Sequence, residues 1–280
     1  MKTRLNPFVK WAGGKKQLLD KLYSRVPTQY GTYYEPFIGG GALFLALQPA
    51  RAVISDINEQ LLNAYLQLKN NAEAVIHQIE SYDSTPCDKA YYLSMRDIFN
   101  HKIRHNELDL ECAALMIWIN KHCFNGLYRV NSKGFFNVSY NNKISGNSIE
   151  KHNLTAIGNY LQNHEISIQH SDFETACSKV KRGDFVYFDS PYVPVSPTAH
   201  FTDYTKDGFS LEDHKRLAKL FRKLDKRGAF VMLSNHNVPL VHELYRAYHV
   251  EIIEVRRNIN RDGAKRIGQE VIIRNYESIS

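Results

Sequence analysis

Cysteine and long hydrophobic runs are both scarce in this sequence. The four cysteines (Cys87, Cys112, Cys123 and Cys177) are scattered over 280 residues and form no CxxC pair. A zinc site or a disulfide framework is therefore not expected, and we interpret the four as reduced thiols. No stretch approaches the ~20 apolar residues that cross a bilayer, and residues 1–14 lack the apolar run of a signal peptide. We accordingly expect a cytoplasmic protein with no membrane partner.

The sequence also lacks internal repeats and low-complexity tracts. Hydrophobic residues make up 43% and charged residues 23%, which is an ordinary globular balance. The net charge of +7 and the pI of about 9.1 suit a polyanionic partner. Many basic enzymes never touch nucleic acid, so the charge alone does not identify the partner.

Short apolar segments alternate with helix-like segments at both ends of the chain. The apolar segments are YYEPFI, RAVISD, EISIQH, DFVYF and GAFVMLSN. Such alternation predicts an α/β fold with a parallel sheet and helices on both faces. Two last β-rich runs, YHVEIIEVRR and QEVIIRNY, flank a basic loop and are typical of a closing hairpin. The expected sheet is therefore mixed but mostly parallel.

The middle of the chain has a different character. Residues from about 71 to 120 have helical patterns, whereas residues 121–147 are rich in Asn, Gly, aromatic and basic residues without a sustained period. We predict a loop-and-hairpin segment exposed for contact. The predicted organisation is one domain formed by residues 1–56 and 148–280, with residues 57–147 inserted into it.

A glycine-rich turn, Glu35-Pro36-Phe37-Ile38-Gly39-Gly40-Gly41, separates a predicted strand from a predicted helix. It lacks the third glycine of G-x-G-x-x-G, which disfavours a dinucleotide-dependent oxidoreductase. It also lacks the lysine of a phosphate-binding P-loop. Asp56 ends the next apolar strand, where a carboxylate can accept both hydroxyls of a ribose. Together they indicate a nucleoside cofactor without phosphates. The alternatives are a structural turn and an N-cap at Asp56.

A second motif, Asp189-Ser190-Pro191-Tyr192, follows the apolar run at residues 185–188. The carboxylate can accept a hydrogen bond from an exocyclic amine, a neighbouring backbone carbonyl can take the second amino hydrogen, and Tyr192 can stack on a base. Catalysis by such a site is mainly orientation and electrostatics. The alternative is a proline turn that closes a strand.

The motifs FVKWAGGK, EPFIGGG, SDIN, FNGLYRVN and DSPY, in this order, resemble the Dam-type DNA adenine-N6 methyltransferases that modify GATC. The resemblance covers residues 8 to about 276. It implies a Rossmann-like methyltransferase fold, methyl transfer from S-adenosylmethionine to adenine N6 in double-stranded DNA, and a DNA target-recognition domain in residues 57–147. No metal and no obligate protein partner are expected, and the enzyme would act on DNA in a bacterial or phage-infected cell, within or outside a restriction–modification pair.

The resemblance also assigns residues to the reaction. Asp189, Pro191 and Tyr192 are the implied catalytic motif. The implied S-adenosylmethionine-binding residues are Trp11, Lys15, Phe37, Gly39, Gly41, Asp56, Asp172, Phe173 and Asp189. From the residues alone, Trp11 would more often be a core aromatic and Lys15 a solvated charge.

Recognition of DNA is assigned in the same way. Arg129 matches the family arginine that reads a guanine, for which bidentate donation to O6 and N7 is the physical reason. Lys10 resembles a DNA contact of the N-terminal motif. Phe124, Asn125 and Leu127 match residues that approach or insert among the bases when the target is flipped out. Basic residues at 256–266 and on the helix around residues 215–227 are candidate phosphate contacts, although a solvated surface is the simpler interpretation of each.

Two segments depart from the family pattern. Ser190 replaces the first proline of Asp-Pro-Pro-Tyr, which leaves the carbonyl in place but removes a φ restraint. Ser139 to Lys143 replaces a run that usually begins with proline, so the stringency of GATC recognition is left open. N4-cytosine methylation is the nearest rival activity, and a catalytically silent DNA-binding regulator is the rival of another class. Asp at position 189 favours adenine, and Trp11, Lys15 and Asp56 favour an enzyme.

Overall fold

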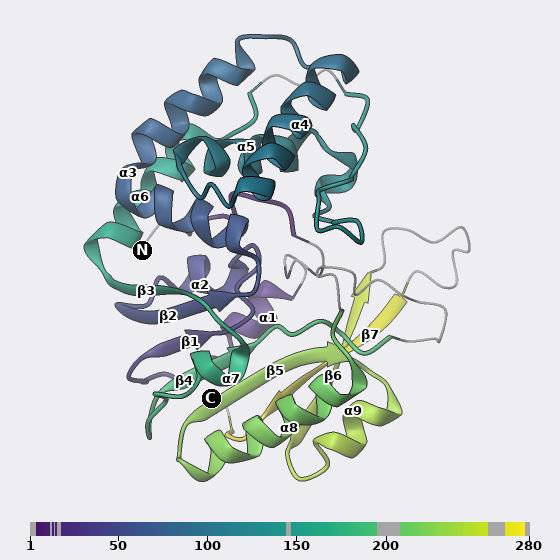
Figure 1. Cartoon of the computed structure of the whole chain (residues 1–280). Coiled ribbons are helices and arrows are strands. Elements are labelled where there is room, and N and C mark those ends of the chain that lie inside the picture. Colours follow the sequence, from purple (N-terminus) through teal and green to yellow (C-terminus); the bar gives the residue numbers. More distant parts are fainter. Residues whose placement is uncertain are drawn as a thin grey trace.

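A sheet of seven strands forms the base of the molecule, in the order β3-β2-β1-β4-β5-β7-β6. The computed structural model describes residues 4–11, 13, 15, 18–143, 147–194, 208–256 and 267–277. The strands are β1 (Tyr33–Glu35), β2 (Arg51–Asp56), β3 (Glu165–His170), β4 (Phe185–Phe188), β5 (Phe230–His236), β6 (His249–Arg256) and β7 (Ile267–Arg274). Figure 1 shows these strands below a group of helices.

Strands β1 to β5 are parallel, and β7 runs antiparallel to both β5 and β6. The mixed, mostly parallel sheet and the closing hairpin are therefore confirmed. The chain changes direction across the sheet between β1 and β4, because β2 and β3 lie on one side of this pair and β5 on the other. Ligands of open α/β sheets bind at the carboxyl ends of the strands beside such a point. The fold is Rossmann-like.

Alternate residues of β4 face two separate layers. Phe185 and Tyr187 belong to one buried cluster, whereas Val186 and Phe188 belong to the other. The first cluster includes side chains of α2 (Ala42–Leu47), α3 (Glu59–Asp83) and α6 (Lys151–Asn163), and the second those of α8 (Leu211–Lys226) and α9 (Pro239–Leu244). Both faces of the sheet are covered by helices, so the strand is apolar on both sides.

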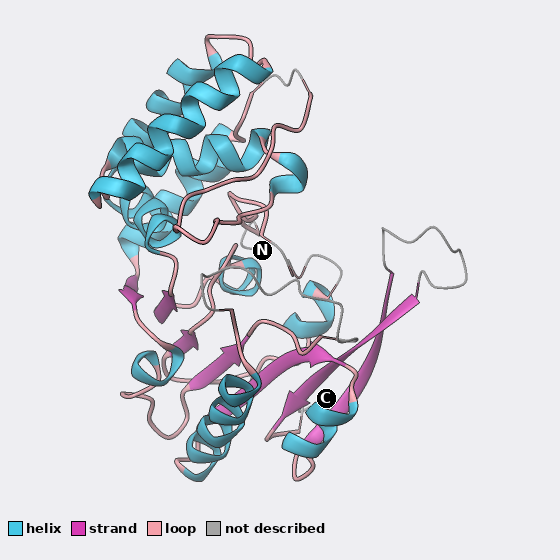
Figure 2. Ribbon diagram, turned by 45° about the vertical axis from the view of Figure 1, so that its right-hand side comes forward, coloured by secondary structure: helices cyan, strands magenta, loops and turns pink. Residues whose placement is uncertain are grey.

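The remaining helices are α1 (Leu19–Tyr23), α4 (Lys89–His105), α5 (Leu110–His122), η1 (Phe124–Gly126) and α7 (Phe173–Ala176). Asn58, Asp88 and Asp109 start α3, α4 and α5, because each side chain accepts a backbone N–H of the first turn. None of the described helices is long and apolar enough to cross a membrane. Figure 2 shows α3 to α6 gathered at one end of the sheet.

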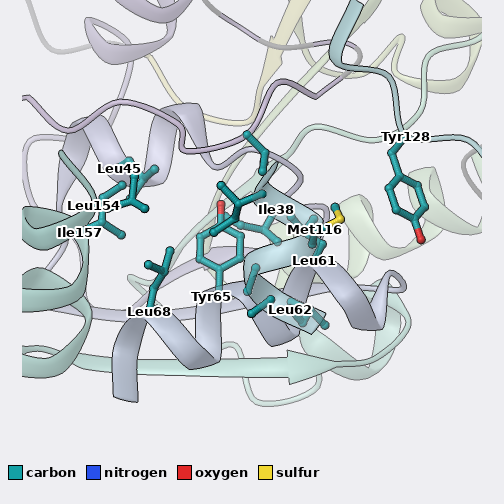
Figure 3. Packing of buried hydrophobic residues seen from close by; sticks show 14 of the residues in the cluster. Ile38, Leu45, Leu61, Leu62, Tyr65, Leu68, Met116, Tyr128, Leu154 and Ile157 are labelled. Carbon is teal, nitrogen blue, oxygen red and sulfur yellow. The ribbon is translucent and has the colours of Figure 1, made fainter. Parts of the chain in front are cut away.

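The helical group is continuous with the sheet through α3. This helix contacts β2 and β3 as well as α5 and α6. Its direction changes at Asn71, which has non-helical dihedral angles and whose Oδ1 accepts the N–H of Ala74 at 3.0 Å. Figure 3 shows side chains of the loop before α2, of α3, of α5 and of α6 in one cluster, including Ile38, Tyr65 and Met116. The division into residues 1–56 with 148–280 and residues 57–147 stays a prediction, since one hydrophobic cluster runs through both parts.

The segment predicted as a loop and hairpin begins two residues later than expected, because α5 continues to His122. Antiparallel bridges then pair Cys123 with Tyr140 and Val130 with Phe136. Phe136 is buried against the ring of Phe99, at a centroid distance of 5.9 Å, so it packs locally. The hairpin is anchored to α4 on one side and leaves its turn residues exposed.

Candidate functional site

Lys15 and Asp189 form a buried ion pair at the carboxyl end of β4. The ammonium nitrogen of Lys15 lies 2.7 Å from Oδ1 of Asp189 and also donates to the carbonyl of Gly13. Only 4% of the Lys15 side chain is exposed, against 21% for Asp189. Lys15 is thus not a solvated charge. An ion pair at this depth holds the carboxylate in one position, and removal of either partner leaves an uncompensated charge.

Opposing influences act on the Asp189 carboxyl group. Burial raises the pKa of Asp189 above its ordinary value, whereas the charge and hydrogen bond of Lys15 lower it. The hydroxyl of Ser234, on β5, donates to Oδ1 at 3.3 Å and itself contacts the hydroxyl of Tyr187 at 2.9 Å. These donors favour the ionised carboxylate, which is the form that accepts a hydrogen bond from an amine. Sequence reasoning missed Ser234, although it is a polar residue near the end of an apolar strand.

Tyr192 is held by three neighbours. Nζ of Lys15 lies 4.6 Å from the centroid of its ring, and the His236 ring meets it edge-on at 4.9 Å. The hydroxyl of Tyr192 donates to Oε2 of Glu270 at 2.9 Å. Burial and the negative charges of Asp189 and Glu270 raise the pKa of Tyr192 well above its ordinary value, so the phenol stays neutral. Glu270 lies on β7, and the sequence carried no signal for it.

The glycine turn is enclosed by two aromatic side chains. Gly39 has φ +44°, and a Cβ there would lie 2.7 Å from Cδ1 of Trp11. Gly41 has φ +66°, and its Cβ would lie 2.5 Å from the hydroxyl of Tyr65, which donates to the Gly39 carbonyl at 3.1 Å. Both positions therefore require glycine for conformation and for space. The turn leads from β1 into α2, as predicted.

Asp56 binds the turn directly. Its Oδ2 accepts the N–H of Gly39 and its Oδ1 the N–H of Asn58, each at 3.0 Å. Asp56 is not the N-cap of α3, because Asn58 has that role and accepts the N–H of Leu61 at 2.8 Å. Burial raises the pKa of Asp56, and these backbone hydrogen bonds oppose the rise. The N–H of Ile57 is a third backbone donor, and a carboxylate with about four lone-pair sites keeps acceptor capacity for a further donor.

Three apolar residues near the strand ends are relevant to the cofactor site. Ile57 directly follows Asp56, and 52% of its surface is exposed. Phe37 stacks on Phe173, with centroids 5.4 Å apart and ring planes at 28°. Asp172 accepts the N–H of Glu174 at the start of α7 and pairs with Arg216 at 3.3 Å, so its carboxylate already has protein partners. Sequence reasoning named Phe37, Asp172 and Phe173 but missed Ile57.

Glu35 is a second carboxyl group under the turn. It is 2% exposed and accepts a hydrogen bond from the Tyr33 hydroxyl at 2.6 Å. Burial raises its pKa well above the ordinary value, and the charge of Asp189 adds to the rise. The residue was seen as part of the motif at 35–41 but was given no role of its own.

The FNGLYR segment forms an exposed turn after α5. Phe124 is 51% exposed, and Asn125 is exposed with φ +56°, a left-handed conformation that asparagine tolerates. Leu127 is partly buried against the main cluster. Arg129 is exposed, and its Nε donates to Oδ1 of Asn137 at 2.8 Å. Its Nη2 also donates to the backbone carbonyl of Asn137 at 3.5 Å, and the remaining N–H groups of the guanidinium can donate to a further acceptor.

Asn120 joins this turn to the N-terminal motif. Its Oδ1 accepts the N–H of Lys10 at 2.7 Å, and its Nδ2 donates to the carbonyls of Lys10 and Gly126 at 2.8 and 3.0 Å. A Cβ at Gly126 would lie 2.5 Å from Cβ of Lys10, so the two segments are in close contact. Asn120 is buried and was missed, because an asparagine near the end of a helix carries no distinctive signal.

Trp11 and Tyr128 complete the connection. Their rings stack at 5.4 Å with planes at 25°, and the Tyr128 hydroxyl donates to Oε1 of Gln60 at 3.2 Å. Trp11 thus contacts both the glycine turn and the segment after α5. The structure therefore brings the predicted cofactor residues and the predicted recognition turn together.

The basic segments are only partly available to a ligand. On α8, Lys215 pairs with Glu212, and Arg216 pairs with Asp172, Glu174 and Asp213. Of the C-terminal cluster, Arg257, Arg261, Lys265 and Arg266 lie outside the described residues. Phosphate contacts at these positions stay a prediction.

Comparison with known proteins identifies the family. Residues 11–259 match the D12 class of N6 adenine-specific DNA methyltransferases. The type II methyltransferase M1.LlaDCHI of Lactococcus lactis subsp. cremoris is 43% identical over 279 residues, covering 98% of this chain and 97% of the relative. The type II methyltransferase M.MjaIII of Methanocaldococcus jannaschii is 40% identical over 290 residues, covering 97% of this chain and 99% of the relative. The DNA adenine methylase of Escherichia coli K12 is 30% identical over 261 residues, covering 92% of this chain and 91% of the relative. The chain belongs to the D12 class of N6-adenine-specific DNA methyltransferases.

Proposed function

We propose that this enzyme transfers a methyl group from S-adenosylmethionine to N6 of adenine within GATC in double-stranded DNA. The observation that carries the proposal is the Lys15–Asp189 ion pair, which lies at the carboxyl end of β4 and joins the N-terminal motif to the catalytic motif. The GATC target rests on the resemblance of FNGLYRVN to the Dam type and on the exposed Arg129. The relatedness to the DNA adenine methylase of E. coli supports adenine as the target base.

The residues around the glycine turn fit S-adenosylmethionine. Asp56 is expected to accept the ribose hydroxyls in addition to its backbone N–H donors, and the exposed Ile57 offers an apolar surface for the adenine ring. Phe37, which is partly buried and stacks on the buried Phe173, is a second apolar candidate for this contact. Gly39 and Gly41 let Trp11 and Tyr65 pack against the turn and so give the loop its shape. Trp11 packs against the turn at Gly39, and Lys15 pairs with Asp189.

When bound, S-adenosylmethionine supplies an electrophilic methyl group on a sulfonium sulfur. Asp189 accepts one hydrogen of the adenine amine, and the carbonyl of Ser190 accepts the other. These two acceptors turn the nitrogen lone pair towards the methyl group. Tyr192 stacks on the base, which is rotated out of the duplex. Lys15 favours the ionised form of Asp189 and holds the carboxylate in place, so the site is organised before the substrate arrives.

Recognition uses the segment after α5. Arg129 donates to a guanine of the site, held in position by Asn137. Phe124, Asn125 and Leu127 approach the bases near the gap that the flipped adenine leaves, and Lys10 contacts DNA from the N-terminal motif. Because Asn120 binds both Lys10 and Gly126, the recognition segment and the N-terminal motif are positioned together.

A single-turnover assay tests the proposal. The protein is incubated with labelled S-adenosylmethionine and a GATC duplex, and the methylated base is identified. We expect N6-methyladenine, at least ~10²-fold slower transfer by Asp189→Ala, and unchanged DNA binding by that variant. Glu243→Ala, which removes an exposed carboxylate from α9, is the control of equal charge change. N4-methylcytosine as product would favour the rival activity, and DNA binding without transfer would favour a silent regulator.

A further inference from the structure

We propose that Glu270 is a positioning residue for Tyr192 and, through it, for the target adenine. The inference rests on the proposed function, in which the flipped base stacks on Tyr192. The hydroxyl of Tyr192 donates to Oε2 of Glu270 at 2.9 Å. Tyr192 lies beyond the end of β4 at Phe188, so the sheet ladder does not hold it, and its ring needs anchors from elsewhere.

The sheet register places Glu270 for this contact. β7 lies between β5 and β6, and Glu270 is paired with His236 of β5. Residues directly opposite on antiparallel strands point to the same face. His236 meets the Tyr192 ring edge-on at 4.9 Å, so both members of the pair face Tyr192. Two strands that carry no part of the catalytic motif therefore determine where its aromatic ring lies.

The three neighbours of the Tyr192 ring occupy different sides of it. Lys15 lies over one ring face at 4.6 Å, His236 lies at the edge, and Glu270 binds the hydroxyl at the far end. A base is then expected on the face opposite Lys15. Rotation or sliding of the ring would displace the base from Asp189. A displacement of about 1 Å can slow a reaction by up to ~10²-fold.

The contact works as a hydrogen bond rather than through charge. The negative charge of Glu270 raises the pKa of Asp189 and so opposes the ionised carboxylate that the reaction needs. A purely electrostatic role would therefore work against transfer. Glu270→Gln removes the charge and keeps an oxygen acceptor, whereas Glu270→Ala removes both, so the two variants separate the two roles.

A double-mutant cycle with Tyr192→Phe tests the proposal. Single-turnover rates on a GATC duplex are measured for the parent, Glu270→Ala, Tyr192→Phe and the combined variant. If Glu270 acts through the hydroxyl, each single change slows transfer by ~10-fold and the combination by the same ~10-fold rather than by ~100-fold. Glu270→Gln retains a rate within about threefold of the parent. Equilibrium DNA binding is unchanged in all variants.

The matched control is Glu254→Ala on β6. Glu254 is exposed and is paired with Gln269, the neighbour of Glu270, so it lies on the opposite sheet face and its removal changes the net charge equally. Melting temperatures show whether each variant is folded. A second readout is the fluorescence of 2-aminopurine at the target position. Glu270→Ala and Tyr192→Phe should be brighter than the parent because stacking on the ring is looser, and Glu270→Gln should match the parent.

The proposal would be overturned if the rate losses of the two single variants multiplied in the combined variant. It would also be overturned if Glu270→Ala transferred methyl groups as fast as the parent, or if Glu270→Gln were as slow as Glu270→Ala. A parent that transfers no methyl group would overturn the proposed function instead. In that case the same cycle is measured on the free energy of unfolding, where independent effects of the two changes would show that the residues are not coupled.

Discussion

The ammonium group of Lys15 lies 2.7 Å from the carboxylate of Asp189, although the two residues are far apart in the sequence. Lys15→Met should slow methyl transfer by at least ~10-fold and lower the free energy of unfolding by up to about 3 kcal/mol, because the carboxylate loses its counter-charge. The pKa of Asp189 should rise further. Since the proposed reaction requires the ionised form, the acid limb of the pH–rate profile should move to higher pH.

Single-turnover rates measured across a range of pH give the change in transfer rate and in the acid limb. Urea unfolding gives the change in stability. Lys151→Met is the control, because Lys151 forms an exposed pair with Glu80. This substitution should change neither the activation free energy of transfer nor the free energy of unfolding by more than about 0.5 kcal/mol. An unshifted acid limb in Lys15→Met would show that the ion pair does not control Asp189.

Asp56→Ala should weaken binding of S-adenosylmethionine by roughly 1–3 kcal/mol, the cost of a lost hydrogen bond to a charged group. It should also lower the melting temperature, since Asp56 accepts the N–H groups of Gly39 and Asn58. Calorimetry measures both. Asp109→Ala, which removes the N-cap of α5, should lower stability while leaving cofactor affinity intact. Equal cofactor affinity of the Asp56 variant and the parent would remove Asp56 from the site.

Arg129→Ala should relax discrimination at a guanine of the target by ~1–3 kcal/mol. Asn137→Ala should do so to a smaller extent, because it removes the acceptor that holds Nε of Arg129. Rates on GATC and on singly substituted duplexes measure the discrimination. A phosphate-binding lysine would instead weaken all sequences alike and reduce the salt slope. A uniform loss on every duplex in Arg129→Ala would contradict the role in base reading.

Ser190 is 2% exposed, and among the described residues its hydroxyl has no hydrogen-bond partner. Ser190→Ala should therefore stabilise the free protein by about 1 kcal/mol, since an unsatisfied buried hydroxyl is removed. Ser190→Pro restores the turn of the family without changing the carbonyl, and faster transfer by this variant would show that the turn limits the rate. Destabilisation by alanine would show that the hydroxyl has a partner, such as an ordered water.

His214, in the first turns of α8, should make the fold sensitive to acid. Burial lowers the pKa of His214 to about 4 from an ordinary value of 6.5. A group whose pKa is lowered by folding contributes stability above its unfolded pKa and loses it as the pH falls towards the folded value. The parent should thus lose up to about 3 kcal/mol from this group between pH 6.5 and 4.

Urea unfolding at pH 7, 5.5 and 4.5 measures this loss. His214→Leu should show a shallower fall with pH than the parent. His77→Leu replaces an exposed histidine of α3 and should follow the parent curve. Parallel curves for all three proteins would exclude His214 as the source.

Much of the fold could be predicted because local patterns sufficed. Apolar runs predicted each strand, and the glycine turn and Asp56 were placed correctly at the ends of β1 and β2. The family could be predicted too, since FVKWAGGK and FNGLYRVN are contiguous motifs that can be identified without any knowledge of the fold.

The rest depended on contacts between distant segments. Lys15 could not be distinguished from a surface lysine until β4 brought Asp189 against it, and Glu270 had no signal until antiparallel pairing aligned it with His236. Asn120 and Ser234 act through hydrogen bonds that exist only in the assembled core. The sequence by itself determined the strand–helix order, the glycine turn and the identity of the motifs, because these follow from residue type and spacing. Only the tertiary structure decided which charges are paired, which carboxylates are buried and which residues hold Tyr192, because pairing and desolvation depend on neighbours that sequence distance does not specify.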